Sequence, residues 1–296
     1  MNMLTVGYLL AVVLGLLMGS FAGATVWRLR ARQLKEDKAA GEEVDAKELK
    51  RLLPLTKASL KNDRSRCLAC GHTLRWYDLL PLVSWLSTRG KCRYCNVAIG
   101  RFEPIMELLT AALFVGFYYY WTVSYPLSTW PVLLVGAVCI VLMVILLAYD
   151  AKWFLLPDRI MYILIAIAAC VAVWNIVTSL DPLITLWSTL GAVLILSGLY
   201  LLLWTWSHGA WVGFGDVKLG LALGLLLSDW QLAFLTLFLA NLIGIVAILP
   251  GLVSKKISRK THVPFGPFLI TGFFIALFFG YRIIDWYLTL TPMLML

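Results

Sequence analysis

Eight long apolar stretches, separated by short polar connections, restrict this chain to a membrane-spanning fold. A helix needs about 20 apolar residues to cross the hydrocarbon, and only a helix or a closed barrel satisfies its backbone there. The chain is 61% hydrophobic and 14% charged, against about 25% charged residues in soluble proteins. We therefore predict an all-α polytopic membrane protein of about eight transmembrane helices, at 4–26, 104–124, 130–149, 159–179, 183–206, 216–228, 231–253 and 264–289.

The basic residues predict how these helices are oriented. Residues 28–101 hold 17 of the 25 Lys and Arg but only 8 of the 16 Asp and Glu, a surplus equal to the net charge of +9. Because basic loops stay on the cytoplasmic side, we place the N-terminus outside. The inside connections are then 27–103, 150–158, 207–215 and 254–263. Orientation in the membrane accounts for the basic charge, so no nucleic-acid partner is predicted.

The ends of the segments fit this orientation. The first apolar stretch has no basic residue before it, and Arg28, Arg30 and Arg32 follow it. This order predicts a transmembrane helix and not a cleaved signal peptide. On the outer side, Asp181 and Asp229 are expected to cap helices, since aspartate is a favoured N-cap residue.

Three domains follow from this division of the chain. Residues 1–27 form the first transmembrane helix, and residues 28–103 form a small polar domain in the cytoplasm. Residues 104–296 form a seven-helix membrane domain.

The polar domain carries a metal-binding pattern. Cys67 and Cys70 form one CxxC pair, and Cys92 and Cys95 form a second, with 21 residues between the pairs. Gly71 and Asn96, just after each pair, suit the tight turn of a metal knuckle. Four thiolates suit tetrahedral zinc, and thiols in a cytoplasmic domain stay reduced. We predict a structural zinc site, because four cysteines leave no position open for a catalytic water; a redox dithiol is the alternative. Cys139 and Cys170 lie inside apolar segments and are expected to be core residues.

Two aspartates at the membrane edge are the candidate catalytic residues. Asp150 ends the third apolar stretch and Asp216 begins the sixth, so the predicted orientation places both at the cytoplasmic face. A carboxylate beside hydrocarbon is costly and therefore suggests a function. Two such groups can share one proton, one acting as a general acid while the other activates water. The pair suggests hydrolysis at the membrane.

Residues around the second aspartate are expected to support it. Gly213 and Gly215 precede Asp216 and allow the backbone to bend and to approach a substrate. Lys218 follows two residues later and is expected to stabilise the anion.

Two further acids are candidates for supporting roles. Asp158 begins the fourth apolar stretch, where an ordinary helix N-cap is the alternative interpretation. Glu107 lies about one turn inside the second stretch and is expected to face a polar site or the zinc domain.

In this order, the motifs make the chain resemble the bacterial type IV prepilin leader peptidases, which are membrane aspartic proteases of the GxGD type. The likeness covers nearly the whole chain. It is carried by Gly19-Ser20-Phe21, Arg28-Leu29, the two CxxC pairs with Arg75-Trp76-Tyr77-Asp78, Pro81, Ser84-Trp85-Leu86 and Arg89-Gly90 between them, Glu103-Pro104, Glu107-Leu108-Leu109, Asp150, Leu155-Leu156-Pro157-Asp158, Gly213–Lys218 and Pro264-Phe265-Gly266-Pro267-Phe268.

The resemblance implies a specific activity. Asp150 and Asp216 would be the catalytic pair, and the four cysteines would hold zinc in the cytoplasmic domain. The family removes a basic leader from type IV prepilins or secretion pseudopilins at the inner membrane. Many members also methylate the new N-terminus with S-adenosylmethionine. The substrate helix and membrane lipid are the implied partners.

Two positions depart from the family pattern. Gly23 stands where the family usually has Asn, and Arg30 stands where it usually has Pro. These departures bear on substrate details more than on the chemistry.

Two other functions compete with this reading. A proton-coupled transporter would use Asp150 and Asp216 as a relay, and a zinc-bearing membrane scaffold would use them only as helix caps.

Overall fold

The computed structural model describes residues 2–56, 64–125, 129–254 and 263–294, and throughout these ranges the regular structure is helical apart from two isolated β-bridges. This confirms the predicted all-α class. Seven of the described helices are long and apolar enough to cross a membrane. The remaining predicted segment, the sixth at 216–228, is also a helix, α9 (Phe214–Leu227), but it has only 14 residues. The basic run at 255–260, within the predicted inside connection 254–263, lies outside the described residues.

The chain forms two compact units, Met1–Ala148 and Tyr149–Leu296, and helix α5 (Trp130–Trp153) runs through the boundary. In the first unit, α1 (Met3–Ala39) packs along α4 (Phe102–Ser124). Glycines on α1 allow this close approach. A Cβ added at Gly15 would lie 2.5 Å from the Cα of Ala111. Small residues at helix contacts bring backbones together in this way in membrane proteins.

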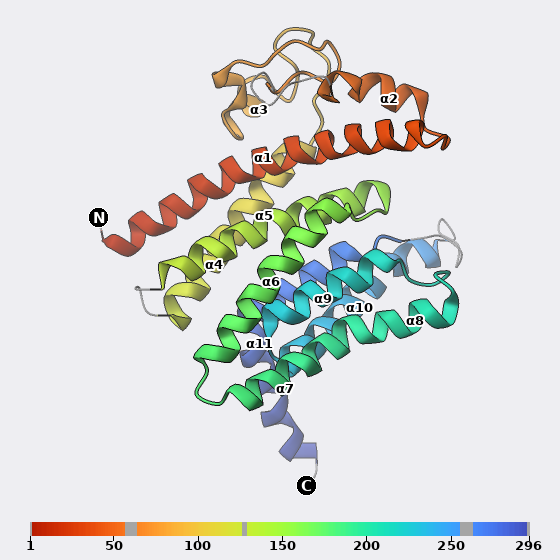
Figure 1. The fold of residues 1–296 in the computed structure, drawn as a ribbon. Helices are drawn as coiled ribbons and strands as arrows, with labels where there is room; N and C mark the ends of the chain where they lie inside the picture. Colours follow the sequence, from red (N-terminus) through yellow and green to blue (C-terminus); the bar gives the residue numbers. More distant parts are fainter. Residues whose placement is uncertain (1, 57–63, 126–128, 255–262, 295–296) are drawn as a thin grey trace. The chain divides into compact units, whose positions relative to one another are not determined.

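Helix α1 continues beyond its apolar part and supports the polar region. Its C-terminal half packs against α2 (Ala46–Leu52) and the short helix η1 (Leu53–Thr56), as Figure 1 shows. A small core holds these elements together, formed by Ala31, Leu34, Leu49 and Leu52. Two further short helices, η2 (Trp76–Leu79) and α3 (Val83–Ser87), lie between the cysteine pairs.

The second unit is built around α9. It contains α6 (Asp158–Thr178), α7 (Pro182–Val193), the π-helical turn η3 (Leu194–Gly198), α8 (Leu199–Ser207), α9, α10 (Trp230–Val253) and α11 (Gly266–Leu294). Helix α9 contacts all the other helices of this unit that these ranges define (Figure 1). Its residues Leu219, Ala222 and Leu223 are completely buried. A helix enclosed by others needs less length than one that spans lipid alone.

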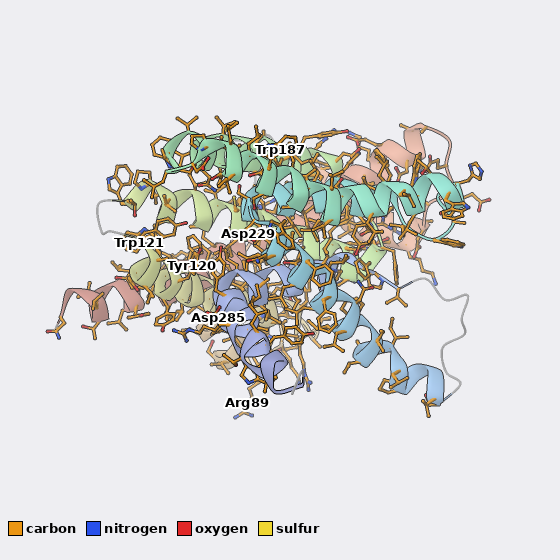
Figure 2. All side chains as sticks on the ribbon, turned by 90° about the horizontal axis from the view of Figure 1, so that it is seen from below. Arg89, Tyr120, Trp121, Trp187, Asp229 and Asp285 are labelled. Atoms are coloured by element: carbon orange, nitrogen blue, oxygen red, sulfur yellow. The ribbon has the colours of Figure 1, made fainter. Side chains whose placement is uncertain are left out.

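Asp181 and Asp229 cap helices, as predicted from the sequence. Asp229, labelled in Figure 2, accepts hydrogen bonds from the backbone N–H groups of Gln231 and Leu232 at the start of α10. Asp181 accepts one from the backbone N–H of Ile184 in α7. Both capping predictions are confirmed.

Glycine is required where α9 meets the π-helical turn. A Cβ at Gly220 would collide with the carbonyl oxygen of Leu196, whereas the nearest neighbour of a Cβ at Gly198 would be a side-chain atom of Leu194 at 3.4 Å. Alanine favours a helix over glycine by up to about 1 kcal/mol at either position. We therefore expect Gly220→Ala to lower the melting temperature of the purified protein and Gly198→Ala to leave it unchanged or raise it. Equal melting temperatures for both variants would contradict this packing.

Candidate active site and metal centre

Asp150 lies near the end of α5 and is almost completely buried, with 5% of its surface exposed. Its carboxylate oxygen Oδ2 accepts a hydrogen bond of 2.9 Å from the backbone N–H of Gly266, the first residue of α11. A Cβ at Gly266 would lie 2.7 Å from the same oxygen. Only glycine therefore allows this contact as it stands. The positive end of the α11 dipole also faces the carboxylate.

Asp216 lies in the first turn of α9, at the positive end of another helix dipole. Its backbone N–H donates to the carbonyl oxygen of Gly213, which is the N-cap residue. The Asp216 carboxylate is close enough to that of Asp150 to interact with it electrostatically. The fold thus brings together two carboxylates that are 66 positions apart in the sequence.

The two glycines before Asp216 have different surroundings. A Cβ at Gly215 would lie 3.0 Å from a methyl carbon of Leu156, so Gly215 lets α9 approach the connection between α5 and α6. A Cβ at Gly213 would lie 3.5 Å from the Asp216 carboxylate, an ordinary contact distance.

Lys218 is placed differently from the prediction. Its Nζ atom lies 2.6 Å from Oδ1 of Asp158 and over the rings of Tyr162 and Phe214. Within the described part of the chain Lys218 forms no ion pair with Asp216, because residues two apart on a helix do not face each other. Asp158 is itself the first residue of α6, with Pro157 in the cap position. Its role here is an ion pair between α6 and α9, and not an N-cap.

Glu107 belongs to the first unit and is 5% exposed on α4. Its Oε2 atom accepts a hydrogen bond of 2.8 Å from the backbone N–H of Leu82, in the segment between the cysteine pairs. Glu107 therefore joins α4 to the segment between the cysteine pairs, and its supporting role stays a prediction.

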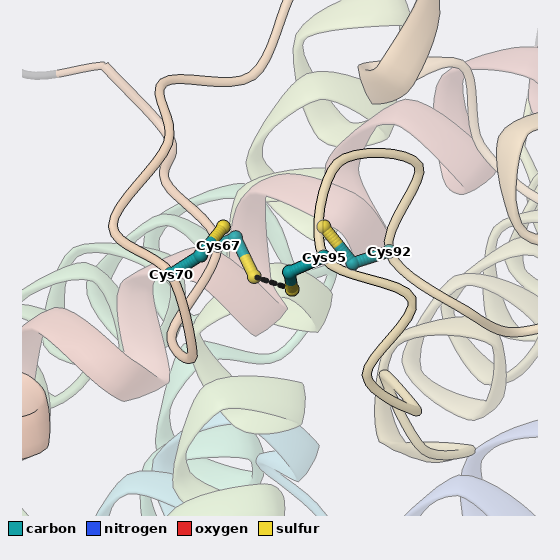
Figure 3. A group of neighbouring side chains, drawn as sticks. All are labelled: Cys67, Cys70, Cys92 and Cys95. Carbon is teal, nitrogen blue, oxygen red and sulfur yellow. Dashed lines mark hydrogen bonds between the residues drawn. The ribbon is translucent and has the colours of Figure 1, made fainter.

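The four cysteines of the two CxxC pairs form one cluster. Their sulfur atoms all lie within 4.8 Å of one another, and the sulfurs of Cys67 and Cys95 are 3.9 Å apart (Figure 3). Tetrahedral zinc with bonds of about 2.3 Å requires sulfurs roughly 3.8 Å apart. The cluster can therefore hold a metal ion with little movement.

Both pairs have the same backbone geometry. The N–H of Gly71 bonds the carbonyl of Cys67, and the N–H of Asn96 bonds the carbonyl of Cys92. Gly71 and Asn96 have positive φ angles of 72° and 57°. This confirms that each pair lies in a tight turn, as these two residue types predicted.

The thiols themselves favour a cation. A backbone hydrogen bond from Val97 lowers the pKa of Cys95, but burial and hydrogen bonds with the other three thiols outweigh it and raise that pKa to about 12. Four neighbouring thiols cannot all ionise without a positive charge between them. A bound metal supplies that charge and takes the thiolate forms.

Comparisons with known proteins decide the family. Residues 13–121 match the Bacterial Peptidase A24 N-terminal domain, and residues 137–249 match the Type IV leader peptidase family. A Prepilin leader peptidase/N-methyltransferase of Pseudomonas aeruginosa is 32% identical over 95% of this chain and 93% of that protein. This chain belongs to the type IV leader peptidase family. Proteins of the same name from Stutzerimonas stutzeri and Burkholderia pseudomallei are 30% and 31% identical over 95% and 91% of the chain, covering 93% and 84% of their own lengths. No solved structure matches.

Membership of the type IV leader peptidase family makes the chain an enzyme and a multi-pass membrane protein. The outward side chains of its helices agree with this. Val173, Trp174 and Val177 on α6 are each at least 60% exposed. Apolar surfaces of this extent require cover by lipid or by another protein.

Sequence reasoning missed two features of this type IV leader peptidase. The contact of Gly266 with Asp150 was not expected, although the sequence Pro264–Pro267 encloses a glycine between prolines at a membrane edge. Tyr200 was also missed, because a tyrosine inside an apolar stretch carries no distinguishing pattern. Its hydroxyl is buried beside Asp216.

The cluster predicts metal content. We expect purified protein to carry one divalent metal ion per chain, and Cys92→Ser to reduce that content severalfold, because Cys92 is the buried ligand of the four. Cys170→Ser is the matched control, because Cys170 lies exposed on α6 outside the cluster. Its predicted place in the core was wrong, whereas Cys139 is buried as predicted. Elemental analysis of the purified variants measures the content. Equal metal in all three proteins would contradict the assignment.

Proposed function

We propose that this chain is a membrane aspartic endopeptidase that removes the basic leader from type IV prepilins or pseudopilins, with Asp150 and Asp216 as its catalytic pair. The observation that supports this proposal is that two carboxylates at helix N-termini lie in one compact unit, near enough to interact electrostatically. The names of the relatives give the substrate class, since each is a prepilin leader peptidase/N-methyltransferase.

The proposed cleavage uses one shared proton. The deprotonated carboxylate takes a proton from water while the water oxygen bonds the carbonyl carbon of the scissile peptide. The protonated carboxyl gives its proton to the carbonyl oxygen. The carbon–nitrogen bond then breaks as the carboxyl that took the water proton gives it to the leaving nitrogen. The other carboxylate takes a proton from a hydroxyl of the tetrahedral intermediate, so the pair again holds one proton. Gly266 keeps Asp150 in place throughout by its backbone N–H.

The second proposed activity is methylation of the new N-terminus. The amine nitrogen of the product bonds the methyl carbon, the carbon–sulfur bond of the donor breaks toward sulfur, and the nitrogen loses a proton. S-adenosylmethionine supplies an activated methyl group of this kind. The N-methyltransferase part of the relatives' names supports this activity.

We propose zinc as the ion in the four-cysteine cluster and a structural role for it. Cys67, Cys70, Cys92 and Cys95 would fill all four positions of a tetrahedral ion, which leaves none for water or substrate. The zinc would hold the two CxxC turns together.

We also propose the predicted orientation, with the N-terminus outside the inner membrane and both aspartates on the cytoplasmic side. The predicted domains are a first transmembrane helix at 1–27, a cytoplasmic zinc domain at 28–103 and a catalytic membrane domain at 104–296. A substrate that is a membrane helix with a basic cytoplasmic leader would present its scissile bond at that face. Lipid and the substrate helix would be the partners.

The burial pattern favours this proposal over a transporter. A proton relay needs ionisable groups through the depth of several helices. Among the described residues, the buried side chains that can ionise near neutral pH are Glu107 and Asp150, and they belong to different units. A non-catalytic scaffold remains the other alternative, and substitution separates it from a protease.

We expect Asp150→Asn and Asp216→Asn each to lower cleavage of a prepilin in detergent by at least about 10³-fold, because an asparagine amide cannot share a proton with the remaining carboxylate. Asp285→Asn is the matched control, since Asp285 is exposed on α11 and labelled in Figure 2. Product masses read by mass spectrometry measure cleavage. If the protein were a scaffold, the two variants would not differ from the wild type in this assay. Retained cleavage in either variant would refute the catalytic pair.

A further inference from the structure

The first unit contains a cavity of about 230 Å³ that the proposed cleavage does not use. It opens between the cysteine turns and the helices α1 and α4. Acidic, basic and apolar groups line it together, among them Trp27, Arg28, Leu55, Leu74, Glu103 and Glu107. A mixture of apolar walls and a few polar groups is typical of small-molecule sites.

One carboxylate oxygen in this cavity lacks a partner. Oε1 of Glu103 accepts a hydrogen bond of 3.3 Å from Nε1 of Trp27, but Oε2 is buried and has no hydrogen-bond partner in the described part of the chain. Buried anionic oxygens are nearly always paired, because removing them from water is costly. A positively charged ligand would supply the missing partner.

We infer that this cavity binds the sulfonium methyl donor S-adenosylmethionine, with Glu103 facing the positive sulfur. The inference rests on the proposed methylation. A methyl donor of this class carries a sulfonium, an ammonium and a carboxylate. The cavity lining includes acids for the cations, Glu103 and Glu107 among them, and several basic residues for the carboxylate, among them Arg66 and Lys91. Its volume is slightly below the roughly 300 Å³ at which drug-sized sites begin. The methionine half therefore fits inside, and the adenosine would extend through the opening.

The test compares two ligands that differ in one charge. S-adenosylhomocysteine lacks the methyl group and the positive sulfur. We expect Glu103→Gln in the full-length protein to weaken binding of S-adenosylmethionine at least tenfold and binding of S-adenosylhomocysteine less than threefold, by equilibrium dialysis of labelled ligand. Glutamine keeps an oxygen for the Trp27 indole. The control Glu42→Gln changes an exposed acid of the same unit and should alter neither affinity.

The outcomes separate this inference from the proposed cleavage. Equal affinities in wild type and Glu103→Gln, or equal weakening of both ligands, would overturn the assignment of Glu103. A wild-type preparation that cleaves prepilin but binds no S-adenosylmethionine would refute the donor site and the methylation while leaving the peptidase intact. If Glu103→Gln melts well below wild type, Glu103→Asp tests the same charge; it should keep the preference for S-adenosylmethionine, and its loss would count against the inference.

A second inference rests on an independent observation in the other unit. Tyr200 begins α8 immediately after the π-helical turn and is 5% exposed. Its hydroxyl is buried without a hydrogen-bond partner among the described residues. Tyrosine hydroxyls that are buried usually have a partner. Short π-helical turns inside α-helices are frequent at functional sites.

The surroundings of Tyr200 are those of the catalytic pair. The Asp216 carboxylate acts on the Tyr200 hydroxyl electrostatically. The Tyr200 ring packs edge-on against Phe265, with 5.5 Å between ring centroids. Phe265 directly precedes Gly266, which binds Asp150. Tyr200 thus packs against the segment that precedes Gly266 and lies near Asp216, and its hydroxyl has no hydrogen-bond partner among the described residues.

We propose that the Tyr200 hydroxyl donates a hydrogen bond to the carbonyl oxygen of the scissile peptide. This oxygen gains partial negative charge as water adds to the carbonyl carbon, until the protonated carboxyl has transferred its proton, and a donor fixed in place stabilises that charge. No proton is transferred from Tyr200 in this role. The hydroxyl would find its partner only when the substrate is bound. This inference also rests on the proposed cleavage.

We expect Tyr200→Phe to lower kcat for prepilin cleavage at least tenfold with KM changed less than about threefold, since loss of one such donor costs on the order of 10²-fold. The melting temperature should be unchanged or higher, because the variant loses a buried hydroxyl that had no partner. The control is Tyr281→Phe, whose hydroxyl bonds Asp229 outside this site; its kcat should match wild type.

Two results would overturn the role of Tyr200. One is a kcat within twofold of wild type in Tyr200→Phe. The other is a clearly lower melting temperature, which would show that the hydroxyl has a structural partner. Absence of cleavage by the wild-type enzyme would instead defeat the proposed peptidase function.

Discussion

The hydrogen bond from the backbone of Gly266 to Asp150 is the interaction on which the proposed active site depends. It joins the start of α11 to the end of α5 and holds a carboxylate that is 95% removed from solvent. A buried carboxylate needs compensation, and here a helix N-terminus supplies both a donor and a favourable dipole. Asp216 lies in the first turn of α9 and receives the same dipole from its own helix.

The short helix α9 explains how these elements meet. Its glycines allow neighbouring backbones to approach, as the contact of Gly220 with the Leu196 carbonyl shows. The hydroxyl of Ser197 in the π-helical turn donates to the carbonyl of Val217, which fixes the start of α9 against that turn. Asp216 and Tyr200 follow from the same arrangement, since each lies within four residues of these contacts. The close packing of α9 thus determines the position of one carboxylate and of the buried hydroxyl.

Hydropathy and local turn chemistry predicted most of the fold. The apolar stretches, the capping by Asp181 and Asp229, and the tight turns at Gly71 and Asn96 depend on nearby residues, so the sequence expresses them directly. The sequence did not predict the contacts between distant segments. Lys218 pairs with Asp158 because α6 and α9 pack against each other, and Gly266 meets Asp150 across 116 positions. The sequence named the two carboxylates as candidates, and their catalytic role stays a prediction; the groups that contact them became known only from the fold.

The most direct measurement of the central claim is an experimental structure of the enzyme with a prepilin-like peptide that carries a secondary hydroxyl in place of the scissile carbonyl. The hydroxyl mimics the water that adds to the peptide. We predict that it lies within hydrogen-bond distance of both carboxylates, those of Asp150 and Asp216, with the Gly266 N–H still bound to Asp150. A peptide bound away from this pair, or carboxylates too far apart to share one hydroxyl, would contradict the proposed mechanism.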